Sequence, residues 1–178
     1  MRFIKSIINF TSDVLETIVF IGSLYIVVYL FLFFPTSVQG ASMEPTFHTG
    51  DRIIVSRVSY KLHQINRGDV IILKSPKNPD IEYIKRVVGL PGETIFFKGG
   101  NVYINGNLLN ESYISVKTNV WENGFSKENV PIIIPDDYLF IMGDNRTHSS
   151  DSREFGPIPI SSVIGKDIFR YYPDMKSP

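Results

Sequence analysis

The chain has 178 residues, which suits one membrane segment and one modest domain. Lysine plus arginine and aspartate plus glutamate each number 18, so the charge gives no indication of a nucleic-acid partner. The absence of cysteine excludes disulfides, thiolate catalysis and cysteine metal sites. The three histidines (His48, His63 and His148) show no metal-ligand spacing, and no GxxxxGK[ST] or GxGxxG motif occurs. We therefore expect no metal, no other cofactor and no nucleotide.

The N-terminus predicts a membrane anchor. Residues 17–34 read TIVFIGSLYIVVYLFLFF, without a charge and close to the length that spans a bilayer. Residues 3–16 look amphipathic, and residues 1–16 are expected in the cytoplasm or at the interface. Arg2 and Lys5 precede the span, which favours a cytoplasmic N-terminus and places residues 35–178 on the opposite side.

Two other readings of this segment are open. The small residues of VQGAS resemble the cleavage site of a secretory signal peptide, but the apolar run is longer than the usual h-region of such a peptide. A buried helix of a soluble domain is disfavoured because the run is apolar all round. The length therefore favours a retained anchor.

The body, residues 35–178, predicts a mostly β domain. Short apolar runs alternate with turn signals, in chain order DRIIVSRV, RGDVIILKSP, IEYIKRVVGLPGE, TIFF, NVYI, NLL, VPIIIP and DYLFIMGD. NVYI-NG-NLL predicts a β-hairpin, because Asn-Gly suits a type I′ turn. Residues 107–130, with Trp121 and mixed charge, look like a looser excursion between strands.

Ser42 and Lys85 have unusual settings. Ser42 lies in GASMEPTF, where small residues precede it and Pro45 stiffens the following turn, which would hold its side chain out of a tight loop. In EYIKRVVGL, strand alternation puts Tyr83, Lys85 and Val87 on one face. If that face is buried, the pKa of Lys85 falls and its neutral amine can act as a base. The alternative is a surface lysine whose head reaches water.

A third stretch, GDNRTHSSDSREFG over residues 143–156, is dense in Asp, Arg and Ser. One reading is a solvated loop with internal ion pairs. The other is a rigid support in which Asp144, Arg146, Asp151 and Arg153 brace each other by bidentate bonds. His148 is the histidine that would serve a Ser-His-Asp triad.

These three stretches, in this order behind an N-terminal anchor, resemble bacterial-type signal peptidase I. The family pattern is SMxPT, a lysine within a YIKRVVGxPGD-like strand, and GDNRxxSxDSRxxG; here these are residues 42–46, 83–93 and 143–156. Residues 50–55 and 67–76 are similar to family segments too, and the resemblance reaches about Pro159. It implies a membrane-anchored catalytic domain with a small β subdomain inserted at about 92–135.

The resemblance implies a Ser-Lys dyad endopeptidase that removes signal peptides after small residues at −1 and −3. Ser42 would be the nucleophile and Lys85 the general base, with preprotein signal peptides and the lipid bilayer as partners. Ser149 matches the serine that orients the lysine, and the backbone N–H of Ser42 would bind the oxyanion. The family residues that hold the conserved loop correspond to Asp144, Arg146, Asp151 and Arg153. Those that line the substrate pockets correspond to Val38, Met43, Tyr83 and Ile84.

The chain departs from the pattern at two places. Some members supply a hydroxyl oxyanion donor two residues before the nucleophile, where this chain has Gly40. Thr147 and His148 replace a more usual acidic-then-amide pair. A soluble Ser-Lys autoprotease of the repressor-cleaving type is disfavoured by the anchor. A non-enzymatic tethered β domain would be favoured if Ser42 and Lys85 lay far apart.

Overall fold

The structure is a computed structural model that describes residues 2–58, 60 and 64–175. His63 lies outside the described residues. The chain divides into two compact units, residues 1–34 and 35–178.

The first unit is dominated by one helix, α1 (Arg2–Leu32), which runs without a break through the amphipathic start. Its stretch Lys5–Leu32 is long and apolar enough, by length and composition, to cross a membrane. The predicted span reached residue 34, but the helix ends at Leu32, where strand β1 (Phe33–Ser37) begins. Pro35 explains this end, because proline disfavours helical backbone in the residue before it and has no N–H to donate.

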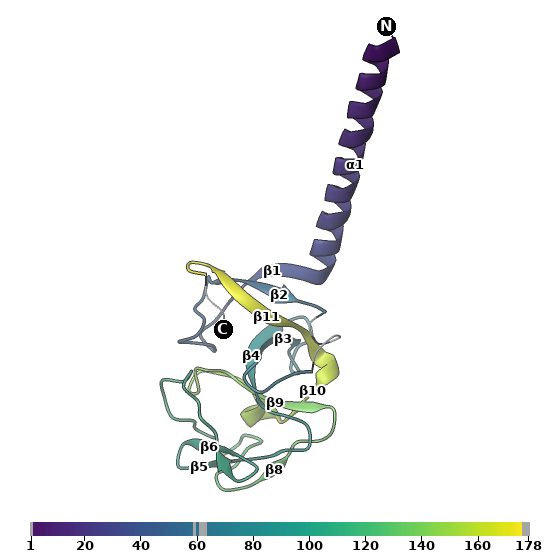
Figure 1. Ribbon diagram of the computed structural model, residues 1–178. Coiled ribbons are helices and arrows are strands. Elements are labelled where there is room, and N and C mark those ends of the chain that lie inside the picture. Colours follow the sequence, from purple (N-terminus) through teal and green to yellow (C-terminus); the bar gives the residue numbers. More distant parts are fainter. Residues whose placement is uncertain (1, 59, 61–63, 176–178) are drawn as a thin grey trace. The chain divides into compact units, whose positions relative to one another are not determined.

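The second unit contains two antiparallel sheets, and the predicted mostly β fold is confirmed. The larger sheet has seven strands in the order β1-β2-β11-β3-β4-β9-β10, and the smaller has the order β7-β6-β5-β8 (Figure 1). The larger sheet adds to β1 the strands β2 (Arg52–Ser56), β3 (Val70–Lys74), β4 (Glu82–Gly89), β9 (Tyr138–Met142), β10 (Ile158–Pro159) and β11 (Val163–Tyr172). The smaller sheet comprises β5 (Thr94–Lys98), β6 (Asn101–Ile104), β7 (Asn107–Leu108) and β8 (Ile132–Ile133).

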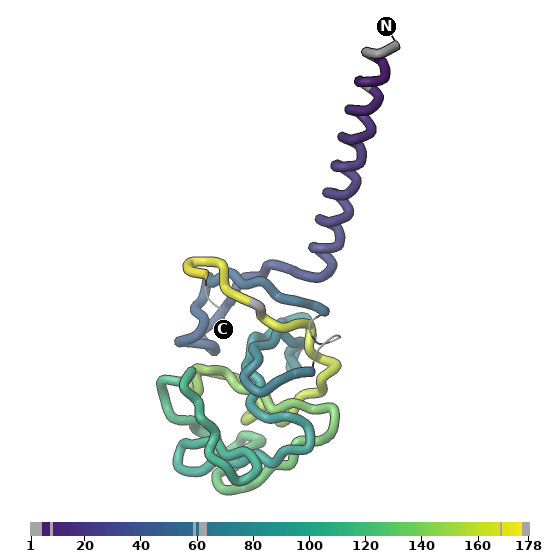
Figure 2. Tube along the Cα trace, viewed as in Figure 1, coloured from purple at the N-terminus to yellow at the C-terminus, as the bar shows by residue number. Residues whose placement is uncertain are grey.

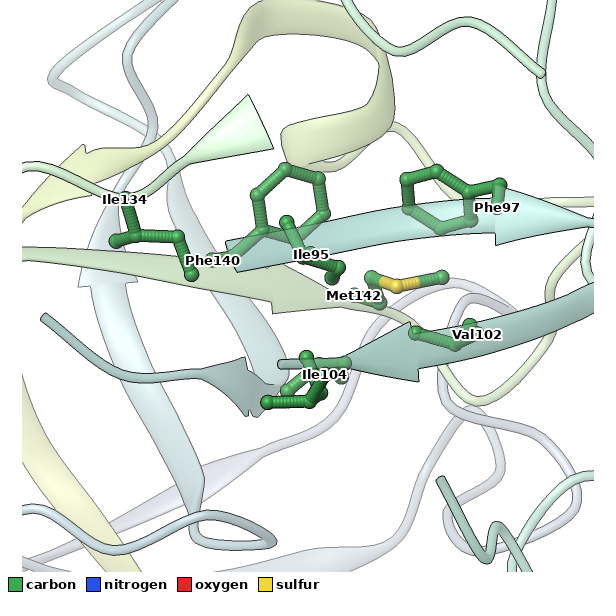
Figure 3. Close-up of a cluster of buried hydrophobic side chains, with 8 residues drawn as sticks. Ile95, Phe97, Val102, Ile104, Ile134, Phe140 and Met142 are labelled. Carbon is green, nitrogen blue, oxygen red and sulfur yellow. The ribbon is translucent and has the colours of Figure 1, made fainter. Parts of the chain in front are cut away.

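Strands β4 and β9 are buried on both faces. Leu139 and Ile141 pack with Val87 in one hydrophobic cluster. Phe140 and Met142, which alternate with them along β9, pack with side chains of the smaller sheet in a second cluster, shown in Figure 3. Because each strand separates two cores, β4 carries no solvent-facing row along its C-terminal half.

The smaller sheet contains the predicted hairpin. Asn105 and Gly106 have φ values of 50° and 82°, the positive values that a type I′ turn requires. Between β7 and β8 the chain follows the expected excursion, drawn in green in Figure 2. All four strands of this sheet fall within 92–135, the range expected for an inserted subdomain, whose status as a separate domain stays a prediction.

The longest strand, β11, was absent from the sequence prediction. It lies between β2 and β3 in the sheet, and Figure 1 shows it in yellow beside β2. Its pairing shifts register between Asp167 and Phe169, between Arg170 and Tyr172, and between Val163 and Gly165. Such shifts break the two-residue alternation by which a strand is recognised in a sequence. Two short helical turns precede it, α3 (Ser152–Phe155) and η1 (Ile160–Ser162).

Candidate active site

Ser42 lies in the loop between β1 and β2. After it, the apolar side chains of Met43 and Phe47 are fully buried and anchor the loop. The Phe47 N–H donates to the Met43 carbonyl at 2.9 Å, which closes a tight turn. Ser42 itself is half-buried, so its hydroxyl lies between the core and the solvent.

Lys85, on β4, reaches the Ser42 hydroxyl. Its Nζ lies 2.8 Å from Ser42 Oγ and donates to the Ile84 carbonyl at 2.9 Å. Lys85 is only 3% exposed, so the alternative of a lysine reaching water is wrong. Burial lowers its pKa to about 8, while the negative charges of Asp151 and Asp144 partly oppose that effect.

The face of β4 opposite Lys85 is not exposed to solvent. Ile84 and Arg86, which alternate with Lys85 along the strand, are buried as well. Each face of β4 meets a different hydrophobic cluster, as described above. A buried cation on this strand therefore needs a buried partner, and Arg86 finds it in Asp144 through bonds of 2.8 Å from Nε and from Nη2.

The loop that follows β9 is a buried charge network, so the solvated-loop reading is wrong. Within residues 143–156, Asp144, Arg146, Asp151 and Arg153 are fully buried, and the fifth charged residue, Glu154, is exposed. Arg153 makes a bidentate pair with Asp151, at 2.9 Å and 2.8 Å, and Asp151 also accepts from the Gly143 N–H. Buried charges that are paired and hydrogen-bonded on several sides give a rigid loop.

The four residues do not all pair with one another, which corrects the prediction. Only Asp151 and Arg153 form an ion pair inside the loop. Asp144 pairs with Arg86 from β4, and Arg146 pairs with Glu111 from the excursion between β7 and β8. The loop is therefore held from two sides by segments remote in sequence.

The excursion between β7 and β8 holds the loop that follows β9, a role that its sequence did not indicate. Glu111 binds Arg146 at 3.1 Å and 2.5 Å, and Thr118 Oγ1 accepts a further hydrogen bond from Arg146. The Tyr113 hydroxyl donates to Glu111, and its ring lies 4.3 Å from the Arg86 guanidinium carbon. The mixed charge of residues 107–130 was the sequence feature that could have indicated this support. Charge alone did not identify Arg146 as the partner of Glu111.

Ser149 is buried and close to the nucleophile loop. A Cβ at Gly143 would overlap both Ser149 Oγ and the Ser42 carbonyl oxygen. The nucleophile loop and the loop that follows β9 therefore approach each other closely at this glycine. Among the described residues, Ser149 Oγ has no hydrogen-bond partner. The role of Ser149 in orienting Lys85 therefore stays a prediction.

The histidines are not placed as a triad requires. His148 and His48 are exposed. His148 Nδ1 contacts Thr147 Oγ1 and Asn145 Oδ1, and no hydrogen bond joins it to Ser42 within the described part of the chain. The same part of the chain holds no group of three or more His, Asp or Glu side chains suited to a metal ion.

A cleft of about 610 Å³ opens beside Ser42 and Lys85. Of the predicted pocket residues, Val38, Tyr83 and Ile84 line it, and Met43, whose side chain is fully buried, does not. The sequence prediction missed the other lining residues, which are Thr36, Ser37, Gln39, Ile53, Ile72, Asp80, Ile81, Glu82 and Ser150.

The cleft has a strand edge along one wall. β4 pairs with β3 from Glu82 to Arg86, whereas its pairing with β9 starts only at Arg86. Among the described residues, the stretch 82–85 thus has a strand partner on one side only. An extended peptide in the cleft can add to such an edge through main-chain hydrogen bonds.

Several known proteins have sequences similar to that of this chain. Residues 11–172 match the family described as signal peptidase, peptidase S26. Signal peptidase I of Bacillus caldolyticus is 38% identical over 151 residues, which cover 81% of this chain and 82% of that protein. Signal peptidase I S of Bacillus subtilis is 33% identical over 174 residues, 95% of this chain and 91% of that one. A probable signal peptidase I-2 of Synechocystis is 36% identical over 76% of this chain, and the match spans 62% of its own length. The chain therefore belongs to the signal peptidase S26 family.

Proposed function

We propose that this protein is a serine endopeptidase that removes signal peptides from preproteins, with Ser42 as nucleophile and Lys85 as general base. The observation that carries the proposal is the 2.8 Å contact between Lys85 Nζ and Ser42 Oγ beside the cleft. Family membership supports the activity, and the burial of Lys85 supports its role, because a lowered pKa makes the neutral amine available near neutral pH.

In the proposed reaction, neutral Lys85 takes the proton of the Ser42 hydroxyl as Oγ attacks the scissile carbonyl carbon. The C–N bond then breaks, and Lys85 returns that proton to the leaving amine, which gives an acyl-enzyme. A water attacks the ester carbonyl and gives a proton to Lys85. The released Ser42 oxygen recovers that proton, so the site returns to its starting state.

The negative oxygen of each tetrahedral intermediate would be bound by the Ser42 N–H. Loss of one such donor in other hydrolases costs about 3 kcal/mol of transition-state stabilisation. Gly40 has no hydroxyl to add a second donor, and a Cβ at Gly40 would meet no atom within 4 Å. The direction of the Ser42 N–H therefore matters more here than in a relative with two donors.

The substrate would bind as an extended strand along the free edge of β4. Small residues at −1 and −3 would enter shallow apolar pockets at Val38, Tyr83 and Ile84, which line the cleft. One extra methylene in such a pocket changes binding by only about 1–3 kcal/mol, so pocket fit alone selects weakly. Delivery of the substrate by the membrane adds to the selection.

The supporting residues would act by holding these groups in place. Asp144, Arg146, Asp151 and Arg153 fix the loop through buried ion pairs, and Ser149 would orient Lys85. Rigid support matters because proton transfer requires the two reacting groups to stay within hydrogen-bond distance.

We also propose that α1 anchors the protein as a single-pass membrane enzyme. Residues 1–16 would lie in the cytoplasm or at its interface, and residues 35–178 on the extracytoplasmic side. Lys5 before the apolar run supports this orientation. The bilayer would then hold enzyme and signal peptide together.

The test compares wild type, Ser42→Ala and Lys85→Ala in detergent, with a preprotein that carries Ala-x-Ala before the cleavage site. Both variants should lose cleavage while circular dichroism and thermal melting show an intact fold. The neutral variant Ser162→Ala, in the η1 turn, should cleave normally. Undiminished cleavage by Lys85→Ala would overturn the dyad.

A further inference from the structure

The loop that follows β9 makes a contact with the nucleophile that the Ser-Lys chemistry leaves unexplained. Asn145 holds two successive carbonyls of the Ser42 loop. Its side-chain Nδ2 donates to the Ala41 carbonyl at 3.0 Å, and its backbone N–H donates to the Ser42 carbonyl at 3.0 Å. These two carbonyls belong to the peptide groups on either side of the Ser42 Cα.

Fixing both peptide groups fixes the backbone of Ser42. A peptide group is planar and trans, so the direction of the Ala41 carbonyl determines the opposite direction of the Ser42 N–H. That N–H is the proposed oxyanion donor. The Ala41 carbonyl also accepts from the Glu44 N–H at 3.3 Å, and a carbonyl that accepts hydrogen bonds makes the N–H of its own peptide group a stronger donor.

The orientation of the Asn145 amide is itself set by its neighbours. Thr147 Oγ1 donates to Asn145 Oδ1 at 3.2 Å, and the ring of His148 contacts Thr147 Oγ1 at 2.9 Å. A hydroxyl donor at Oδ1 leaves Nδ2 to face Ala41. Thr147 and His148 are the two residues by which this loop departs from the usual family pattern, so the departure has a structural consequence.

We propose that Asn145 is a positioning residue for the oxyanion donor: it aims the Ser42 N–H, and Thr147 holds the Asn145 amide in the orientation that does so. This rests on the proposed function, in which Ser42 N–H binds the oxyanion. Asn145 touches neither the substrate nor Lys85 in this scheme. Its loss should weaken the transition state and leave ground-state binding unchanged.

The experiment compares Asn145→Ala and Thr147→Val with wild type as full chains in detergent, at equal concentrations of active sites titrated with a serine-reactive probe. For Asn145→Ala we expect kcat to fall about 10-fold, less than for deletion of a donor, with KM within about twofold. The Ki of a peptide aldehyde, which forms a tetrahedral adduct with Ser42, should rise by the same factor as kcat falls. The Kd of the cleaved signal-peptide product should not change.

The effect of Thr147→Val, alone and combined with Asn145→Ala, and a control variant complete the test. Thr147→Val keeps Asn145 and should lower kcat about threefold, with no additional loss in the Asn145→Ala background, because both changes act on one hydrogen-bond chain. The matched control is Asn107→Ala, which removes an Nδ2-to-carbonyl bond in the smaller sheet, outside the cleft.

The outcomes separate this inference from the proposed function. A kcat within twofold of wild type for titrated Asn145→Ala, or a rise in KM alone, overturns the positioning role. If Ser42→Ala retains cleavage, the proposed function itself fails. If Asn145→Ala does not fold, Thr147→Val decides, since an unchanged kcat and aldehyde Ki in that variant contradict the inference.

Discussion

The pH dependence of cleavage follows from the environment of Lys85. Burial lowers the pKa of its amine from 10.5 to about 8. The reaction needs the neutral form, which is about one tenth of the enzyme at pH 7 and about nine tenths at pH 9. We therefore expect kcat/KM to rise about tenfold between these pH values, with its half-maximum near 8. A lysine with its ordinary pKa would be neutral in only ~0.03% of molecules at pH 7.

The assay is cleavage of a short signal-peptide substrate without ionisable groups near the scissile bond, in detergent from pH 6 to 10. Lys98→Met, which removes an exposed lysine, serves as the control and should keep the same profile. A flat profile, or a half-maximum near the histidine value of about 6.5, would refute lysine as the base.

Three further predictions concern buried groups. Lys85→Met should stabilise the fold by about 3 kcal/mol below pH 8, because the wild-type fold disfavours the ammonium; the gain shrinks as pH rises from about 8 to 10.5. Glu111→Gln should cost about 3 kcal/mol, or ~9 °C in Tm, since Arg146 is fully buried and loses its charge partner. Gly143→Ala should lower kcat/KM about 100-fold, because the new methyl group overlaps the Ser42 carbonyl and displaces the nucleophile.

Melting measurements test the first two predictions, and cleavage kinetics test the third. Thermal melts at pH 7 and pH 10 measure the first, and an unchanged or lower Tm for Lys85→Met at pH 7 contradicts it. Glu122→Gln, an exposed acid in the same excursion, should melt like wild type. Gly22→Ala, where a Cβ meets no atom within 4 Å, should cleave normally. Wild-type kcat/KM in Gly143→Ala would show that the Ser42 loop tolerates displacement.

Much of the fold was readable from the chain. The apolar run predicted α1, because a helix with no polar face belongs in a membrane. The short runs between turn residues predicted most strands of both sheets, and Asn105-Gly106 predicted a hairpin that the structure confirms. These features depend on residues close together in sequence, where local backbone preferences decide.

The candidate site was only partly readable. Residue patterns alone left open whether Lys85 is buried; the family resemblance singled it out together with Ser42. The position of β11 was missed because its register shifts hide the alternation of a strand.

The sequence by itself determined which segments become helix, strand or turn, and which residue types can carry the chemistry. The tertiary structure alone decided which charges meet. Arg86 lies 58 residues from Asp144 and Glu111 lies 35 residues from Arg146 along the chain, yet each pair is bidentate and buried. The first pair depends on the pairing of β4 with β9, and the second on the packing of the excursion against the loop that follows β9. Local sequence does not determine such contacts, yet folding must supply them because a buried charge without a partner is strongly destabilising.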